Sequence, residues 1–447
     1  MNLIFFFAEI FKLIIALSIF CLASIVREPW VVKMRTELLL LLLFLGLGLI
    51  LLEVWNLRKT PNKLKNFFSF LLIFLAATGS SIALGKETSF LITKQEVLNQ
   101  NSQRLANLGQ HFIVGYWDFE EVKNLVEKQA IGGVFITQRN VYNKTADEIK
   151  QEIESLQAIR ASQGLSPLWI ASDQEGGNIS RLSPPLTKLS TISNIIGKEK
   201  NPNNKKQEII EYTTKKGQEL ADIGVNLNFA PVVDLNKGII DPTDRYSRIY
   251  DRAISKDKKV VTKVALWYCD TLSKLNIRCT LKHFPGLGRV EGDTHLKEVN
   301  LDASITELNA DDWLPFRTIM NFSDAFIMLS HVKLTALDGS NPVSFSNKVV
   351  KGLIRERWKY DGVLITDDFC MEAVYGSKDG IKVATVKAIN AGVDLILISH
   401  DPSQYYPAMK SLLIADRIGN INYKLLDESK VRLERNKKVL FVNRSSQ

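Results

Sequence analysis

Two of the chain's five histidines lie in one short stretch, rich in glycine and proline, that runs from Lys282 to His295. Lys282 and His283 open the stretch, and Asp293 and His295 close it. A carboxylate beside an imidazole fixes the tautomer of the ring and favours its protonated form, as a general acid–base requires. The lysine and the first histidine are donors suited to hydroxyls or to an anionic group. The simpler alternative is a charged surface loop in which Asp293 and His295 only order the backbone.

A pair of adjacent carboxylates, Asp367 and Asp368, directly follows the apolar run 363–366. Adjacent residues at the end of a strand point in opposite directions, so at most one of the two faces the interior. We expect the other to cap the next helix or to bind backbone amides.

Both groups follow short apolar runs of the kind that form buried strands. Eight such runs alternate with helix-period segments, which implies parallel pairing through crossovers and predicts a single (β/α)8 TIM-type barrel. A doubly wound open sheet fits less well, because Tyr116-Trp117-Asp118-Phe119 follows the first strand in place of a glycine-rich phosphate motif. The predicted strands are His111–Gly115, Gly133–Thr137, Leu168–Ser172, Val225–Phe229, Ile277–Leu281, Ala325–Leu329, Val363–Thr366 and Asp394–Ser399.

Polar or ionisable residues follow six of these strands, and in a closed parallel barrel those ends meet on the face that carries active sites. They include Asp173, Asp234, Lys282-His283, His331, Asp367-Asp368 and His400. Arg181 and Arg252 are further candidate donors. His331 and His400 have no third partner at metal-ligand spacing, so we interpret them as site-lining or core residues and predict no metal site. His111, at a strand start, is interpreted as structural.

Charge and cysteine content exclude several function classes. The net charge is +9, and residues 1–90 hold nine Lys/Arg against five Asp/Glu, which leaves only +5 on the rest. No basic stripe interleaved with aromatic residues is present, so we expect no nucleic-acid partner. The four cysteines lack CxxC or Cys/His spacing, which predicts neither a zinc site nor a disulfide. We interpret Cys269, Cys279 and Cys370 as small core residues, and we expect no cofactor.

The first 87 residues predict a membrane anchor of about three helices, with two as the alternative count. The apolar runs are 3–26, 38–52 and 66–85, and about 20 helical residues cross a hydrocarbon core of about 30 Å. The loop between the second and third runs carries four basic residues against three in the earlier loop, which places it in the cytoplasm. Residues 88–447 would then form a domain on the other side of the membrane.

Several motifs, in order along residues 100–435, resemble the family 3 glycoside hydrolases, and within them the bacterial β-N-acetylglucosaminidases. The stretch 282–295 is similar to that branch's K-H-F-P-G-H-G followed by D-[ST]-H, and 353–367 to the family's active-site signature. Further counterparts are 132–134 with Arg139-Asn140, 173–177 with Arg181, 224–235, and Asp251-Arg252-Ala253. Two positions depart from the pattern: Leu287 stands where the family has a second histidine, and Cys370 where a small residue is usual.

The resemblance implies a retaining mechanism with Asp367 as nucleophile and His295, paired with Asp293, as general acid–base. An imidazole would replace the usual acid carboxylate of such enzymes. The resemblance also implies that one sugar, N-acetylglucosamine, is bound in the −1 subsite by Asp173, Arg181, Arg252, Lys282 and His283. The substrate would be a glycan with terminal N-acetylglucosamine, for example one derived from peptidoglycan.

Two other functions remain open. One is a family 3 glucosidase or xylosidase without the acetamido preference; such relatives usually take their acid–base from a second domain, for which this chain has little room after its eighth strand. The other is a membrane-tethered glycan-binding protein on an inherited barrel, suggested only by Leu287 and Cys370. Fold alone does not choose among the three.

Overall fold

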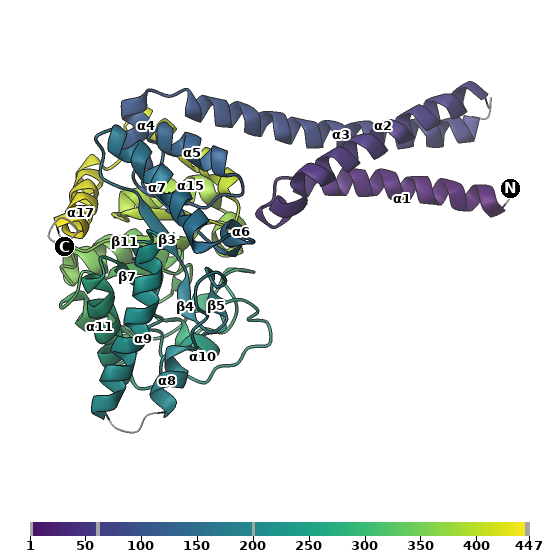
Figure 1. Cartoon of the computed structure of the whole chain (residues 1–447). Helices are drawn as coiled ribbons and strands as arrows, with labels where there is room; N and C mark the ends of the chain where they lie inside the picture. Colours follow the sequence, from purple (N-terminus) through teal and green to yellow (C-terminus); the bar gives the residue numbers. More distant parts are fainter. Residues whose placement is uncertain (1–2, 60–62, 199–201, 443–447) are drawn as a thin grey trace. The chain divides into compact units, whose positions relative to one another are not determined.

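A computed structural model describes residues 3–59, 63–198 and 202–442 of the chain. These residues form two compact units, Met1–Asn99 and Gln100–Gln447 (Figure 1). The boundary predicted at 87/88 lies within helix α3 (Lys63–Leu98). This helix runs past residue 88 without a break and ends one residue before the end of the first unit. That boundary stays a prediction.

The first unit consists of helix α1 (Leu3–Ile25), a short 3-10 helix η1 (Pro29–Met34), α2 (Arg35–Lys59) and α3. Its three long helices are each long and apolar enough to cross a membrane, as predicted. Small side chains on α1, including Ala16 and Ala23, are fully buried against α2 and α3, and such residues let helices approach closely in a bilayer. Charged residues in or next to the apolar runs bind each other: Lys12, within the first run, lies 2.8 Å from Glu53, which directly follows the second.

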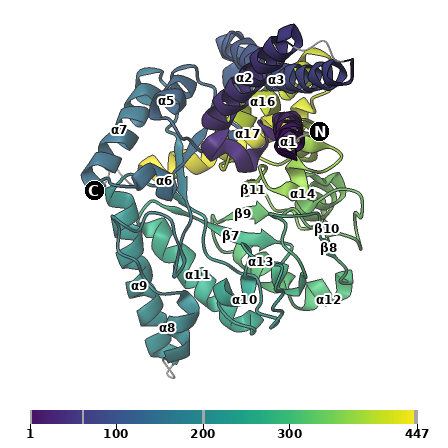
Figure 2. The ribbon, with the colours of Figure 1, turned by 90° about the vertical axis from the view of Figure 1, so that its right-hand side faces the viewer.

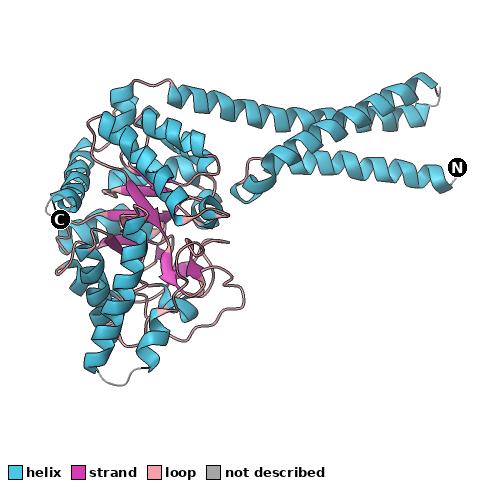
Figure 3. Cartoon of the chain, viewed as in Figure 1, coloured by secondary structure: helices cyan, strands magenta, loops and turns pink. Residues whose placement is uncertain are grey.

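The second unit contains a closed barrel of eight strands, so the predicted fold is confirmed and the open sheet is excluded. All neighbouring strands pair in parallel, and helices surround them (Figures 2 and 3). Around the barrel the strands are β1 (Phe112–Val114), β12 (Leu395–Ile398), β11 (Leu364–Asp368), β9 (Phe326–Leu329), β7 (Arg278–Phe284), β6 (Leu227–Asn228), β3 (Trp169–Ser172) and β2 (Gly133–Phe135).

The helices of this unit arise where the sequence supplies apolar residues at helical spacing and polar caps. Helix α7, for example, begins after Thr145, whose side chain and that of Glu148 bind each other's backbone amides in a capping box. The segment Lys348–Arg357, between β9 and β11, forms a π-helix, η4. The helices are α4 (Ser102–Gly109), α5 (Phe119–Glu127), α6 (Gln138–Val141), α7 (Ala146–Ser162), α8 (Ile192–Lys198), α9 (Pro202–Asp222), α10 (Ile249–Arg252), α11 (Lys258–Lys274), α12 (Ile305–Ala310), α13 (Trp313–Met320), η4 (Lys348–Arg357), α14 (Glu372–Tyr375), α15 (Gly380–Ala391), α16 (Tyr405–Arg417) and α17 (Tyr423–Val442).

Short additional elements lie in the segments that follow the barrel strands. They are the hairpin of β4 (Gln174–Gly176) and β5 (Ile179–Ser180), the pair β8 (Asn300–Leu301) and β10 (Lys333–Leu334), and the 3-10 helices η2 (Leu287–Arg289), η3 (Val343–Phe345) and η5 (Pro402–Gln404).

Large apolar side chains fill the barrel interior. The ring of Trp169 on β3 lies 5.0 Å from that of Phe326 on β9, although β6 and β7 separate these strands, so the two meet across the interior. Phe135 stacks on Phe229 at 5.6 Å in the same way. Because this core is packed, polar groups can be presented only at the strand ends.

Two barrel strands carry an extra residue at the point where site candidates occur. Between Leu281 and Phe284, β7 advances by three residues while β9 advances by two, from Ile327 to Leu329. The strand β11 does the same against β12 between Ile365 and Asp368. Such irregularities break the alternation of side chains and redirect them. Lys282, His283 and Asp367 all lie within these two irregularities.

The prediction of cysteines without a disulfide is wrong at two positions. Cys269 on α11 and Cys279 on β7 form a disulfide, with Cα atoms 5.4 Å apart. The expectation rested on motif spacing, which identifies metal sites but does not reveal which residues a helix and the next strand bring together. Cys370 is a buried free cysteine, as predicted.

Candidate active site

Four of the five predicted sugar-binding residues and one unpredicted carboxylate form the base of the site. Lys282 Nζ lies 2.6 Å from both Asp173 Oδ1 and Glu175 Oε1. Arg252 binds both oxygens of Glu175, at 2.6 and 3.0 Å. Arg252 Nη2 also lies 3.4 Å from His283 Nε2.

Charge compensation explains how these groups tolerate burial. Burial alone would raise the pKa of Glu175, but Arg252 and Lys282 outweigh it and hold that pKa well below its ordinary value. Burial likewise opposes the charge of Arg252, yet Glu175 raises the pKa of the guanidinium above its usual range. The carboxylate of Asp173 remains partly open, with 24% of its side chain exposed. The network is therefore charged, pre-organised and open to solvent at one edge.

His283 is held by a buried aspartate at the end of β6. Asp234 Oδ2 lies 2.7 Å from His283 Nδ1 and accepts the backbone N–H of His283 at 3.1 Å. Its other oxygen accepts the N–H of Leu287 at 2.7 Å. Because the carboxylate can only accept, Nδ1 carries the proton of a neutral ring and Nε2 faces Arg252. Asp234 thus fixes both the ring and the start of the loop that follows.

Asp293 and His295 form the predicted pair. His295 Nδ1 and its backbone N–H bind Asp293 Oδ1 at 2.7 and 2.9 Å, and Asp293 is almost fully buried. Ser247 Oγ and the N–H groups of Arg245 and Tyr246 also donate to Asp293, at 2.9 to 3.1 Å. Burial would raise the pKa of Asp293, but His295 and these amides lower it to about 2. The side chain of His295 is 38% exposed, and its Nε2 has no hydrogen-bond partner in the described part of the chain.

The loop that carries the pair is bound to the segment after β11. Ala373 donates its N–H to the carbonyl of Thr294 at 3.2 Å, and Glu372 donates to that of His295 at 3.3 Å. Both donors belong to α14, which follows Asp367 closely. Within the loop, Gly292 has a φ of +110°, and a Cβ atom on Gly288 would lie 1.8 Å from the carbonyl oxygen of Leu235. Glycine is required at both positions, in the second because the backbones approach so closely.

Asp367 and Asp368 divide their roles as expected. Asp368 accepts hydrogen bonds from the backbone N–H groups of Cys370, Ser399 and His400, at 2.8 to 3.0 Å. Asp367 is half-buried, and the loss of water around its carboxylate would raise its pKa. The imidazoles of His283, His331 and His295, in that order, together with the N–H of Asp368, lower it instead. The electrostatic influence of these imidazoles therefore favours the ionised form of the Asp367 carboxylate at the mouth of the barrel.

The remaining candidates lie as follows. Arg181 follows β5 and donates its backbone N–H to the carbonyl of Asp173 at 3.1 Å; its guanidinium forms no ion pair within residues 3–59, 63–198 and 202–442. His331 is buried between Ser344 Oγ and the carbonyl of Asp368, which agrees with a site-lining position. His111 is buried at the opposite end against the carbonyl of Asp394, and burial lowers its pKa to about 4, so it is structural as predicted.

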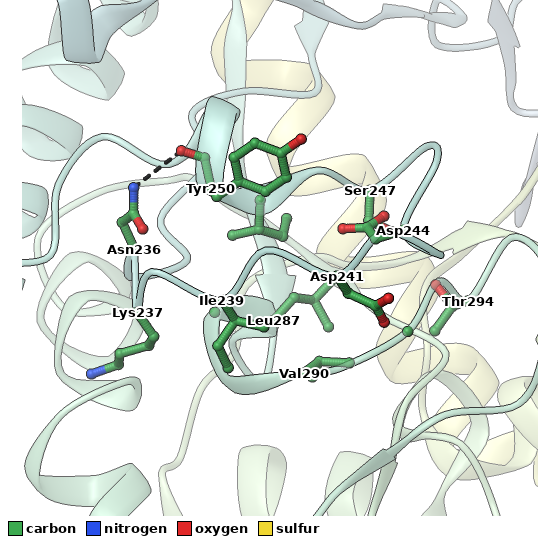
Figure 4. Close-up of a pocket in the computed structure, with 13 residues that line it drawn as sticks. Asn236, Lys237, Ile239, Asp241, Asp244, Ser247, Tyr250, Leu287, Val290 and Thr294 are labelled. Atoms are coloured by element: carbon green, nitrogen blue, oxygen red, sulfur yellow. Dashed lines mark hydrogen bonds between the residues drawn. The ribbon is translucent and has the colours of Figure 1, made fainter.

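Leu287 does not face the charged network. It lines a small pocket between the segments 236–250 and 287–294, together with Ile239, Ile249 and Val290 (Figure 4). Its side chain is 6% exposed. The substitution of a histidine by leucine at this position therefore puts an apolar contact between two loops, one of which carries Asp293.

Sequence reasoning did not single out Glu175 or Ser247, and it noted Asp234 only as a polar residue after a strand end, with no role in the site. Glu175 was detectable, since it lies two residues after Asp173 in an extended segment and so shares a face with it. Asp234 follows a predicted strand end and carried a weaker signal. Ser247 carried no signal in the sequence, because its role depends on the conformation of its loop. That conformation brings its hydroxyl to Asp293 and its carbonyl within 2.7 Å of Arg252 Nη1.

Comparison with known proteins identifies the barrel unit. Residues 103–435 match the model of the Glycosyl hydrolase family 3 N terminal domain. Beta-hexosaminidase A of Pseudoalteromonas piscicida is 31% identical over 335 residues, which are 70% of this chain and 54% of that protein. The Beta-hexosaminidase of Nitrosomonas eutropha is 31% identical over 287 residues, 63% of this chain and 77% of the relative.

A solved structure agrees with these relatives. The family 3 beta-N-acetylglucosaminidase from Paenibacillus sp. str. FPU-7 superposes with a TM-score of 0.69 at 27% identity. The superposition covers 76% of this chain and 63% of that one. The chain thus spans little more than half of the Pseudoalteromonas protein and less than two thirds of the Paenibacillus chain.

Proposed function

The chain belongs to glycosyl hydrolase family 3, and we propose that it is a retaining exo-β-N-acetylglucosaminidase that removes terminal β-linked N-acetylglucosamine. The names of the similar Beta-hexosaminidases and of the Paenibacillus beta-N-acetylglucosaminidase support this substrate class. The observation that carries the proposal is the pairing of a solvent-exposed imidazole, His295, with a buried aspartate, in a loop whose backbone binds the helix that follows Asp367.

In the first step, Asp367 attacks the anomeric carbon while protonated His295 gives its Nε2 proton to the glycosidic oxygen. The bond to the aglycone breaks, and an ester bond between the sugar and Asp367 forms. In the second step, neutral His295 takes a proton from water, the water oxygen attacks the anomeric carbon, and Asp367 leaves as a carboxylate. Histidine suits both halves because imidazole titrates near neutral pH. Asp293 stays ionised and keeps the Nδ1–H of the ring in place.

The charged network at the base of the site is proposed to hold the sugar in the −1 subsite. Asp173 has an open carboxylate for a hydroxyl, Lys282 and Arg252 supply fixed donors, and His283 lines the site with its Nε2 beside Arg252. Arg181, whose guanidinium forms no ion pair with the residues that the structure describes, completes the set as a further donor. Glu175 holds Arg252 and Lys282 in position, and Asp234 holds His283. Neither carboxylate therefore needs to touch the sugar.

We further propose that the barrel unit lies outside the cytoplasm, anchored by α1–α3. Two observations support this location: the larger number of basic residues between α2 and α3, and the disulfide between Cys269 and Cys279, which persists in oxidising compartments. We expect a reporter enzyme that is active only outside the cytoplasm to be active when it is fused after α17. Activity of a reporter that requires the cytoplasm would contradict this topology.

The test of the activity is the release of nitrophenol from 4-nitrophenyl N-acetyl-β-glucosaminide by the full chain in detergent. Asp367→Ala should reduce the rate by at least about 10⁴-fold, because it removes the group that forms the intermediate. Asp361→Ala is a matched control at the opposite end of β11, where its exposed carboxylate pairs with Arg435, and it should retain the parent rate. Full activity of Asp367→Ala would refute the assignment.

The choice of sugar and of glycan needs separate measurements. The rate on the N-acetylglucosaminide should exceed that on the matching glucoside and xyloside; the reverse order would favour a glucosidase or xylosidase. We propose peptidoglycan-derived glycans as the natural source, which fits an extracytoplasmic anchor. A higher kcat/KM on an N-acetylglucosaminyl muramic acid disaccharide than on chitobiose would support this source, and the opposite preference would contradict it.

A further inference from the structure

We propose that Tyr246 is the platform of an aglycone-binding (+1) subsite that takes a pyranose ring. The inference rests on the proposed function, because it assumes that His295 protonates the glycosidic oxygen. Tyr246 lies in the long segment between β6 and α11, and nothing in the family signature quoted above includes this residue.

The first observation is the position of the tyrosine ring. Its centroid lies 5.4 Å from that of His295, with 47° between the ring planes, and 57% of the residue is exposed. A large aromatic side chain that remains more than half exposed beside a reactive group has apolar area available for a ligand.

The second observation is that the backbone of Tyr246 is held rigidly. Its N–H and that of Arg245 both donate to Asp293 Oδ2, at 2.9 and 3.1 Å. The next residue, Ser247, is buried and binds Asp293 through its hydroxyl and Arg252 through its carbonyl. The same aspartate therefore orients His295 and fixes the backbone that carries the tyrosine. A pre-organised platform of this kind loses little conformational entropy when a ligand binds.

The chemistry of the reaction decides what meets this ring. His295 Nδ1 is occupied by Asp293, so only Nε2 can reach the glycosidic oxygen. The aglycone is attached to that oxygen and must lie against His295, on the side away from Asp367. A pyranose in that position can lay the C–H groups of one face on the electron-rich face of Tyr246 while its hydroxyls stay in water.

Another exposed aromatic residue at the same end of the barrel shows why Tyr246 is preferred. Trp117, which follows β1, is 43% exposed. The guanidinium of Arg139 already lies 4.5 Å from the centre of its ring, and its indole N–H donates to the carbonyl of His400. One face of Trp117 is therefore occupied, and the residue is not in ring contact with His295.

The test compares two substrates that share the −1 sugar, namely chitobiose and methyl N-acetyl-β-glucosaminide, on the full chain in detergent. Only chitobiose places a ring in the +1 position. For Tyr246→Ala and Tyr246→Leu, the ratio of kcat/KM values, chitobiose over methyl glycoside, should fall about five- to tenfold, mainly through KM. Tyr246→Phe and Tyr246→Trp, which keep an aromatic face, should retain the ratio within about twofold.

Phe322→Ala is the matched control, because Phe322 is 76% exposed and lies between α13 and β9, at the opposite end of the barrel. It should leave the ratio unaltered. An unchanged ratio in Tyr246→Ala would overturn the subsite while the proposed function stands. An equal loss on both substrates with a shifted pH profile would do the same, since Tyr246 would then act only through Asp293. A parent protein inactive on both substrates would overturn the proposed function, and the subsite with it.

Discussion

Each of the two units contains a lysine that contacts two carboxylates, buried in the barrel and half-buried in the helical unit, and the two clusters differ in what surrounds them. In the barrel, Lys282 lies 2.6 Å from Asp173 and from Glu175, and Asp173 is 24% exposed. In the helical unit, Lys12 lies 2.9 Å from Glu9 and 2.8 Å from Glu53, and the Glu53 side chain is 1% exposed. Glu53 also accepts hydrogen bonds from Ser69 at 2.6 Å and Asn56 at 3.1 Å.

The two clusters differ in whether protein groups occupy all of the carboxylate oxygens. The oxygens of Glu53 are bound by residues from all three helices, so the cluster's effect is to fix how α1, α2 and α3 pack. The barrel cluster has an open edge at Asp173, whose side chain is 24% exposed, so it can bind a hydroxylated ligand. The same ionic chemistry thus stabilises packing where it is closed and prepares a binding site where it is open.

The largest effect is expected at the centre of the open cluster. Glu175→Gln should destabilise the barrel by roughly 3–5 kcal/mol, because it leaves Arg252 and Lys282 buried without their shared anion. The measurement is urea unfolding of the full chain in detergent, followed by hydrolytic activity. Glu298→Gln is the matched control: its exposed pair with Lys333 should contribute at most about 1 kcal/mol. Equal losses of unfolding free energy in the two variants would contradict the view that Glu175 compensates the buried charges of Arg252 and Lys282.

The covalent link of the barrel should have the next largest effect. The disulfide joins residues ten apart, and its loss should cost roughly 3 kcal/mol through the added freedom of the unfolded chain. Addition of a reductant should therefore lower the midpoint of barrel unfolding in the parent but not in Cys269→Ala/Cys279→Ala. Cys370→Ser is the control and should keep the reductant response. A parent that is insensitive to reductant would contradict the bridge.

Much of this barrel was predictable because its signals are local. The runs 111–115 and 394–399 are short, apolar and separated by helix-period segments, and they form the neighbouring strands β1 and β12. The disulfide was not predictable, because it depends on where α11 packs against β7. The π-type hydrogen bonding of η4 was not predictable either, because residue types at helical spacing do not distinguish it from an α-helix.

The site was predictable where chemistry coincides with a strand end. Lys282, His283 and Asp367 follow apolar runs, and the structure brings them to one mouth. Their final orientation depends on an extra residue in β7 and in β11, and a register shift of this kind cannot be read from residue types. Tyr246 and Ser247 lay beyond prediction for a different reason: they come from a loop without periodicity, which Asp293 organises through tertiary hydrogen bonds.

A smaller effect is expected in the closed cluster. Lys12→Met should destabilise the helical unit by roughly 1–2 kcal/mol, because it leaves the charge of Glu53 without its partner on α1. The double variant Lys12→Met/Glu53→Met should recover part of this loss, since it removes both charges. Thermal loss of helical signal in detergent measures the first unit, and loss of hydrolysis reports the barrel separately. A change in the barrel midpoint would contradict the view that the two clusters act independently.

The last effect is confined to acid pH and concerns the open site. The pKa of Asp293 is lowered to about 2, against about 3.9 in an unfolded chain. Its contribution to stability is therefore fully present above about pH 4 and is lost as the pH falls towards 2. Between pH 5 and pH 2, the unfolding free energy of the parent should decrease more steeply than that of Asp293→Asn. Parallel curves would mean that Asp293 is not bound to His295 and the amides of residues 245 and 246 in solution, and the platform proposed for Tyr246 would lose its support.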